Sequence, residues 1–155
     1  LAFHAQVETE SAADREHLIS VIQGVTREYT LETGTAIKFI GPNRPVDVVL
    51  AAEPFKDALF LLLANAGHFG GGQTVEVTVE EKGNQAEIGI RDQGPGFSEE
   101  AHLKAVEPFW TTESDALGLG LFQARKLIEG QGVAVDVGNS DGGGGEVVVS
   151  LCYEQ

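Results

Sequence analysis

The sequence predicts an α/β two-layer sandwich, and three observations support this fold class. Apolar residues recur at three- and four-residue steps in some segments and at every second position in others, so both helices and strands are expected. The alternating segments are joined by hairpin links instead of regular strand–helix–strand units, which favours a sheet covered by helices. A chain of 155 residues, 42% of them hydrophobic, suits one domain that buries roughly 70% of its unfolded surface.

The first helix is expected over residues 14–33, where leucine, isoleucine, valine and tyrosine recur along one face. Ser11 or Asp14 is the candidate N-cap, because side chains of both types accept hydrogen bonds from unpaired backbone amides. Gly34 is the residue at which the helix should end.

Two short strands and a second helix should follow. Residues 35–40 and 46–51 are rich in strand-forming types, and the segment Gly-Pro-Asn-Arg-Pro at 41–45 between them is a strong turn signal. The second helix is expected over 54–69, with proline in its first turn and a broad apolar face. The three glycines at 70–72 should stop it.

A β-hairpin is predicted in the middle of the chain. Residues 74–81 alternate valine with threonine and glutamate, and residues 85–91 continue the alternation after a short turn at 82–84. One face of this hairpin should meet water, and the other should pack against helices.

The second half begins with a long segment, 92–117, which is interrupted by glycine and proline and contains a candidate short helix at 99–106. A connection of this length inside a compact domain usually has a function. Helical periodicity returns over 117–129, and residues 133–137 and 146–151 alternate as strands.

The composition excludes several classes of protein. The net charge of −14 repels nucleic acid and anionic lipid, so any phosphate ligand must be held locally, by backbone amides and a metal ion. Cys152 is the only cysteine, which excludes an internal disulfide, and we expect it to be a core thiol on the last strand. The longest apolar run, residues 58–64, is far shorter than the roughly 20 residues that span a bilayer. Because the chain starts at Leu1 with no preceding linker, we expect it to be a fragment of a longer protein.

Asn65 is the first candidate site residue, because it interrupts the apolar run LFLLLANAGHF. A buried asparagine without partners is costly, so it is either a satisfied core residue or an oxygen ligand for a hard cation such as Mg²⁺. His68 and Phe69, three and four positions further, should share roughly the same helix face.

Two glycine-containing segments are the other candidates. In RDQGPGF, Asp92 follows a strand and either belongs to a simple turn or accepts a hydrogen bond from an exocyclic amine, while the glycines let the backbone approach a flat ring. In LGLGL, Gly118 and Gly120 open a helix, where they either allow close packing or present backbone amides to an anion.

Taken in order, LLLANAGHF, RDQGPGF, EPFWTTE and ALGLGLFQARKLIEGQG resemble the N, G1, F and G2 boxes of the ATP-binding domain of sensor histidine kinases. The resemblance covers about residues 12–152 and extends to the superfamily of gyrase, heat-shock chaperone and mismatch-repair ATPases. It implies a single Bergerat-type ATP-binding domain over 1–155, with a mixed, mostly antiparallel sheet covered on one face by helices and an ATP lid at 98–117. The phosphoacceptor, dimerisation and sensor domains would lie outside this fragment.

The resemblance also assigns roles. Asn65 would bind Mg²⁺ that bridges the ATP phosphates, and Asp92 would accept a hydrogen bond from the adenine N6 amine. Phe69 would flank the adenine, and His68 stands where the family often has a lysine that faces the phosphates, so Asn65 and His68 are the catalytic candidates. The remaining nucleotide contacts would be Gly94, Gly96, Phe97, Phe109, Thr111, Thr112, Gly118, Leu119, Gly120 and Leu121.

Three positions depart from the family pattern: Leu61 replaces an asparagine, Glu113 a lysine and Ala116 a glycine. The residues expected to form the pocket therefore match the family pattern better than the residues expected to contact the phosphates. The expected function is a cytoplasmic Mg-ATP-dependent histidine kinase domain that phosphorylates a histidine on a separate dimerisation domain. Its further expected partner is a response regulator, and its parent would be a homodimer that is soluble or membrane-anchored. The alternatives are a degenerate nucleotide-binding regulatory domain and an anti-sigma-factor serine kinase.

Overall fold

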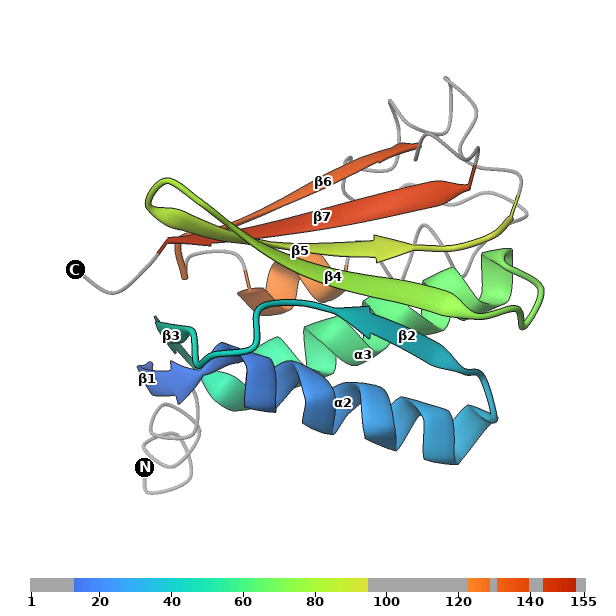
Figure 1. Ribbon diagram of the computed structural model, residues 1–155, viewed down its shortest axis with the longest axis horizontal. Coiled ribbons are helices and arrows are strands. Elements are labelled where there is room, and N and C mark those ends of the chain that lie inside the picture. Colours follow the sequence, from blue (N-terminus) through green and yellow to red (C-terminus); the bar gives the residue numbers. More distant parts are fainter. Residues whose placement is uncertain (1–12, 95–122, 129–130, 140–143, 153–155) are drawn as a thin grey trace.

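The computed structural model describes residues 13–94, 123–128, 131–139 and 144–152, which form a layer of strands and a layer of helices (Figure 1). The main sheet has five strands in the order β2-β4-β5-β7-β6. Its strands are β2 (Ile37–Ile40), β4 (Val75–Lys82), β5 (Gln85–Arg91), β7 (Gly145–Cys152) and β6 (Val133–Asn139). Strand β2 is parallel to β4, and the other neighbours are antiparallel, which confirms the mixed, mostly antiparallel sheet that the resemblance implied.

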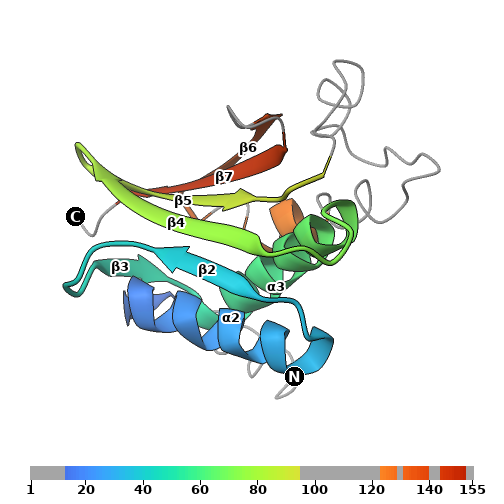
Figure 2. The ribbon, with the colours of Figure 1, turned by 45° about the vertical axis from the view of Figure 1, so that its right-hand side comes forward.

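Two long helices, α2 (Leu18–Thr33) and α3 (Ala52–Phe69), cover one side of this sheet (Figure 2). Alternate residues of the predicted hairpin, among them Val77 and Ile88, are fully buried beneath them. The predicted hairpin is present, and its turn is one residue shorter than expected, because Lys82 belongs to β4 and pairs with Gln85 across two residues. Residues 123–128 are helical as expected and bury Ala124 and Ile128. The core therefore lies between the sheet and the helices.

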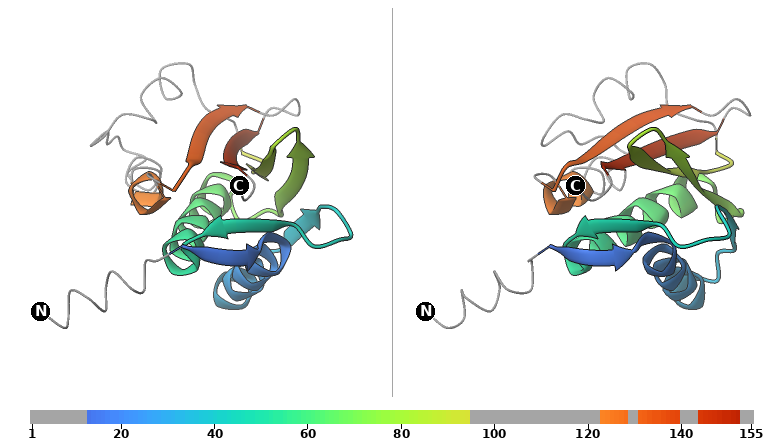
Figure 3. Two further views of the ribbon diagram at one scale, coloured as in Figure 1. Left: turned by 90° about the vertical axis from the view of Figure 1, so that its left-hand side faces the viewer. Right: turned by 60° about the vertical axis from the view of Figure 1, so that its left-hand side comes forward.

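The predicted start of the first helix was wrong. Residues 14–17 form strand β1 (Asp14–His17), which pairs antiparallel with β3 (Asp47–Leu50) in a separate two-stranded sheet (Figure 3). The helix begins at Leu18, whose backbone N–H donates to the Val46 carbonyl at 2.8 Å. Because His17 is the N-cap residue and this strand-to-helix junction satisfies a free amide with backbone, Asp14 does not cap the helix, and Ser11 lies outside the described residues. Its C-terminal end is confirmed, since Gly34 adopts φ +77°.

The expectation that Cys152 is a core thiol was also wrong, because this cysteine is exposed. Leu151, one residue earlier, is buried against the helices. Side chains alternate between the two faces of a strand, so Cys152 falls on the face of β7 away from the core.

None of the helices in the described ranges combines the length and apolar composition that a membrane-crossing helix requires.

Candidate functional site

Asn65 lies in the C-terminal half of α3, on the stripe of that helix that packs toward the sheet. It is only 6% exposed, and its Nδ2 atom is buried without a hydrogen-bond partner among the residues that the structure describes. An unsatisfied buried amide costs about 1–3 kcal/mol, so this residue weakens the fold where it stands. A buried polar atom without a partner requires an explanation, and the binding of a ligand or ion is one.

Asp92 directly follows β5 and is held by backbone. Its Oδ1 atom accepts hydrogen bonds from the N–H groups of Gly94 at 2.8 Å and Gly145 at 3.1 Å. The Asp92 N–H donates in turn to the Gly145 carbonyl at 3.0 Å. Within the described residues Oδ2 has no hydrogen-bond partner, so it is left to accept a bond from a ligand.

Asn65, Phe69 and Asp92 line one cavity between α3, β5 and β7. The rest of its wall is apolar and consists of Leu62, Ala66, Ile90 and Val147. Its volume is about 10 Å³, which is close to the space for one water molecule. A ligand pocket usually has roughly 300 Å³ or more. The described residues by themselves therefore enclose too little space for a flat ring.

Close backbone approaches at this site require glycine at two positions. A Cβ atom at Gly94 would overlap the Phe69 carbonyl, and one at Gly144 would overlap the Asp92 carbonyl. The end of α3, the segment after β5 and the start of β7 thus converge on Asp92. Larger side chains at 94 or 144 would separate the three segments.

An ion-pair cluster beside Asp92 connects the ends of β4, β5 and β7. Arg91 Nε donates to Glu146 Oε2 at 2.5 Å, and Arg91 Nη1 donates to Glu76 Oε1 at 3.2 Å. The hydrogen bond to Glu146 raises the pKa of Arg91 above its ordinary value. The guanidinium therefore stays charged, and it joins β4, β5 and β7 on the face of the sheet opposite the helices.

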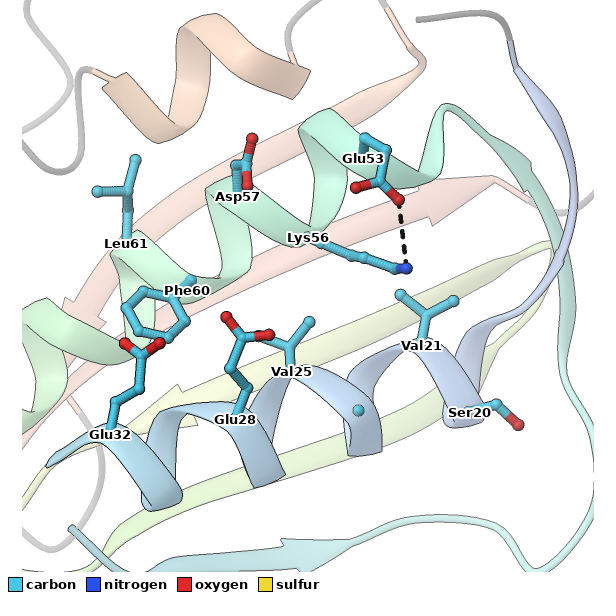
Figure 4. A pocket seen from close by; sticks show the side chains of 11 residues that line it. Ser20, Val21, Val25, Glu28, Glu32, Glu53, Lys56, Asp57, Phe60 and Leu61 are labelled. Carbon is cyan, nitrogen blue, oxygen red and sulfur yellow. Dashed lines mark hydrogen bonds and ion pairs between the residues drawn. The ribbon is translucent and has the colours of Figure 1, made fainter. Parts of the chain in front are cut away.

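Two further residues of the predicted N box do not line the cavity. The His68 side chain is exposed and meets the Phe69 ring edge-on, with ring centroids 5.0 Å apart. Leu61 lines a separate groove between α2 and α3, with a volume of about 790 Å³ (Figure 4). The structure thus brings Asn65, Phe69, Asp92 and Gly94 together and leaves His68 and Leu61 outside.

Two residues beside Asp92 were not predicted from the sequence: Gly145, which forms two backbone contacts with it, and Gly144, which lies close to its carbonyl. The run of four glycines at 142–145 was the available signal, because a simple turn between two strands does not need so many. The remaining predicted contacts lie outside the described residues, namely Gly96, Phe97, Phe109, Thr111, Thr112, Gly118, Leu119, Gly120 and Leu121.

Comparison with protein families gives a match over residues 51–155 to the family described as histidine kinase-, DNA gyrase B-, and HSP90-like ATPase. Among curated proteins, the chain is similar to the C4-dicarboxylate transport sensor protein DctB of Pseudomonas aeruginosa, with 45% identity over 64 residues. This alignment covers 40% of the chain and 10% of DctB, so the chain spans a small part of that relative's length.

Comparison with solved structures shows that the chain has the fold of histidine kinase catalytic domains. The catalytic domain of histidine kinase ThkA matches with a TM-score of 0.78 and 24% identity, over 91% of this chain and 95% of that one. Full-length ShkA in complex with AMPPNP matches with a TM-score of 0.76 and 21% identity, over 93% of this chain and 32% of that one.

Proposed function

Because the chain belongs to the family of histidine kinase-, DNA gyrase B- and HSP90-like ATPases, we propose that it binds Mg-ATP in the cavity between α3, β5 and β7. We propose further that it transfers the γ-phosphoryl group to a histidine on a separate dimerisation domain. Within two-component signalling, a response regulator would then receive the group. The parent protein would be a homodimer, with this domain in the cytoplasm.

One observation carries the nucleotide proposal: a backbone-anchored carboxylate and an unsatisfied amide share an otherwise apolar cavity. With Oδ1 of Asp92 occupied by two amides, Oδ2 would accept a hydrogen bond from the adenine N6 amine. Phe69 and the apolar residues around it would cover the faces of the ring. The AMPPNP in the ShkA complex is consistent with such a ligand in a protein of this fold.

The residues present also suit a magnesium ion that arrives with the nucleotide. Mg²⁺ prefers oxygen ligands and is usually bound by one or two protein groups, phosphate oxygens and waters. The described residues contain no cluster of three or more histidine, cysteine or acidic side chains. Asn65 lines the cavity together with Asp92, and its side-chain oxygen Oδ1 would supply the protein oxygen. When bound, the ion would neutralise charge on the β- and γ-phosphates.

Phosphoryl transfer would then depend on positioning. The anchored Asp92 would fix the adenine, and Asn65 would orient the phosphate end one helix turn from Phe69. The exposed His68 and the backbone amides of Gly118 and Gly120 would face the phosphates, which gives local hydrogen-bond donors to an otherwise acidic protein. The γ-phosphoryl group would move in line to a nitrogen of the incoming histidine.

The proposal is tested in two steps with the purified chain. First, calorimetric titration with ATP, with and without Mg²⁺, should show saturable binding that Mg²⁺ strengthens. Second, labelled ATP and the histidine-bearing helical segment of the parent protein should yield a phosphorylated segment, stable in base and labile in acid. Absence of nucleotide binding would contradict the whole proposal.

A second candidate function is a nucleotide-binding regulatory domain that transfers no phosphate. Leu61 favours it, because this side chain lines the outer groove and has no polar atom with which to contact an ion or water. In the second step above, clear binding of ATP without any transfer would select this alternative.

A further inference from the structure

The groove between α2 and α3 is a second hollow, separate from the cavity around Asp92. Figure 4 looks into it with the sheet behind the two helices. Its apolar lining comes from Val21 and Val25 on α2 and from Phe60 and Leu61 on α3. At about 790 Å³ it is within the size range of sites that bind ligands, roughly 300–1,000 Å³.

The rim of the groove is acidic. Glu28 and Glu32 on α2 and Asp57 on α3 are exposed, and none forms an ion pair within the described residues. Glu53 is paired with Lys56 at 3.3 Å, the cation that the groove contains. Three carboxylates therefore remain uncompensated around an apolar floor, an arrangement that complements a ligand with apolar and cationic sides.

Gly24 leaves open space in which a ligand could approach the backbone of α2 closely. It lies exposed in the middle of the helix and lines the groove, and a Cβ atom there would meet nothing within 4 Å. Nothing inside the described chain thus requires glycine, which costs a helix about 1 kcal/mol relative to alanine. Leu31 is seven positions further on the same side of α2 and is 79% exposed, which extends the apolar strip beyond the groove.

We propose that this groove is a docking surface for a cationic amphipathic helix of a partner protein. An apolar floor with charged rims is the usual receptor for such a helix, and close approach at Gly24 suits a helix backbone. The rim from Ser20 to Glu32 has a length of about 18 Å, so it accommodates about three turns of the partner. A second copy of this chain is disfavoured as the occupant, because each copy carries a net charge of −14.

The test uses a defined peptide and the isotope-labelled 155-residue chain. The probe is a capped 14-residue peptide with leucine along one helical face and lysine elsewhere. We expect saturable binding, with NMR shift changes concentrated in α2 and in residues 53–61 of α3. Affinity should fall as salt is added. Shift changes that are absent from these segments would overturn the proposal.

Matched variants separate docking from general charge attraction. Glu28→Lys should weaken binding about five- to tenfold, because an attractive rim charge becomes repulsive. Asp136→Lys makes the same charge change at an exposed position on β6 and should leave affinity within about twofold. Gly24→Leu should weaken binding about tenfold or more while raising thermal stability. Equal losses for Glu28→Lys and Asp136→Lys would overturn the proposal.

Two control measurements address other occupants. The same peptide with glutamate in place of lysine should not bind, and comparable binding would show that cationic charge plays no part. Sedimentation of the wild-type chain and of Gly24→Leu should show no self-association that depends on Gly24. If Gly24→Leu abolishes self-association of the chain, the groove is an interface between two copies of this chain, and the proposed partner is wrong.

Discussion

Asp92 is held on one side by backbone amides and is open on the other, which makes its carboxylate a fixed acceptor. In Asp92→Asn, the Oδ1 contacts to Gly94 and Gly145 would be kept, but an amide NH₂ would replace the free oxygen. A donor would then face the adenine N6 amine. A hydrogen bond to a charged group is worth about 1.5–3 kcal/mol, so ATP affinity should fall roughly ten- to hundredfold.

Calorimetric titration measures this change, and Asp136→Asn is the matched control because it removes one exposed carboxylate elsewhere. Equal ATP affinities for wild type and Asp92→Asn would show that Asp92 does not bind the adenine.

Asn65 is expected to lower the stability of the fold and to contribute to Mg-ATP binding. Asn65→Ala removes the unsatisfied Nδ2 atom and introduces a better helix former, gains that offset the small void left behind. The free energy of unfolding should therefore stay within about 1 kcal/mol of wild type. Mg-ATP binding should lose more affinity than binding of metal-free ADP. If denaturant unfolding showed a loss above about 2 kcal/mol, or both nucleotides lost affinity equally, Asn65 would be a structural residue.

The packing of α2 against α3 depends on one buried glycine. A Cβ atom at Gly67 would overlap the hydroxyl oxygen of Tyr29, which is 3% exposed and packs edge-on against Phe60. Gly67→Ala should lower the free energy of unfolding by about 1–2 kcal/mol, because the steric cost exceeds the gain in helix propensity. Adding Tyr29→Phe removes the overlapping oxygen and should recover part of the loss.

Gly24→Ala is the control for this experiment, because it makes the same substitution at an open helical position. It should raise stability by about 0.5–1 kcal/mol. Urea denaturation of wild type and the three variants measures these differences, and a Gly67→Ala protein as stable as Gly24→Ala would show that the helices separate at no cost.

Helices and strands could be predicted where the apolar pattern extends over many residues, as in α2, α3 and the β4–β5 hairpin. The prediction failed at residues 14–17, because a four-residue strand has too short a pattern to be distinguished from the first turn of a helix. Strand β3 provides its partner from more than 30 positions away, and only tertiary pairing decides that outcome.

For the whole molecule, nucleotide binding should appear as stability. At an ATP concentration 100 times its Kd, binding adds about 2.7 kcal/mol to the free energy of unfolding. For a domain of this size that corresponds to a rise in Tm of about 5–10 °C. GTP should give a smaller rise, because its O6 carbonyl would place an acceptor against the Asp92 carboxylate. Equal shifts for ATP and GTP in a thermal melt would contradict adenine recognition by Asp92.

The four ordered sequence boxes were enough to predict that Asn65, Phe69, Asp92 and Gly94 lie close together. They could not predict the contribution of Gly145, because that contact depends on the register of β5 against β7, which places Arg91 opposite Glu146. The acidic α2–α3 groove could not be predicted from the sequence either, because it depends on the way the two helices pack and not on either helix alone.

The small volume of the cavity around Asp92 has a thermodynamic consequence. If an empty protein keeps these walls together most of the time, the measured affinity is the intrinsic affinity multiplied by the fraction of molecules that are open. With about 1% open, the apparent dissociation constant is roughly a hundredfold weaker than the contacts alone provide. Any partner that holds α3 away from β5 and β7 would therefore tighten nucleotide binding without touching the nucleotide.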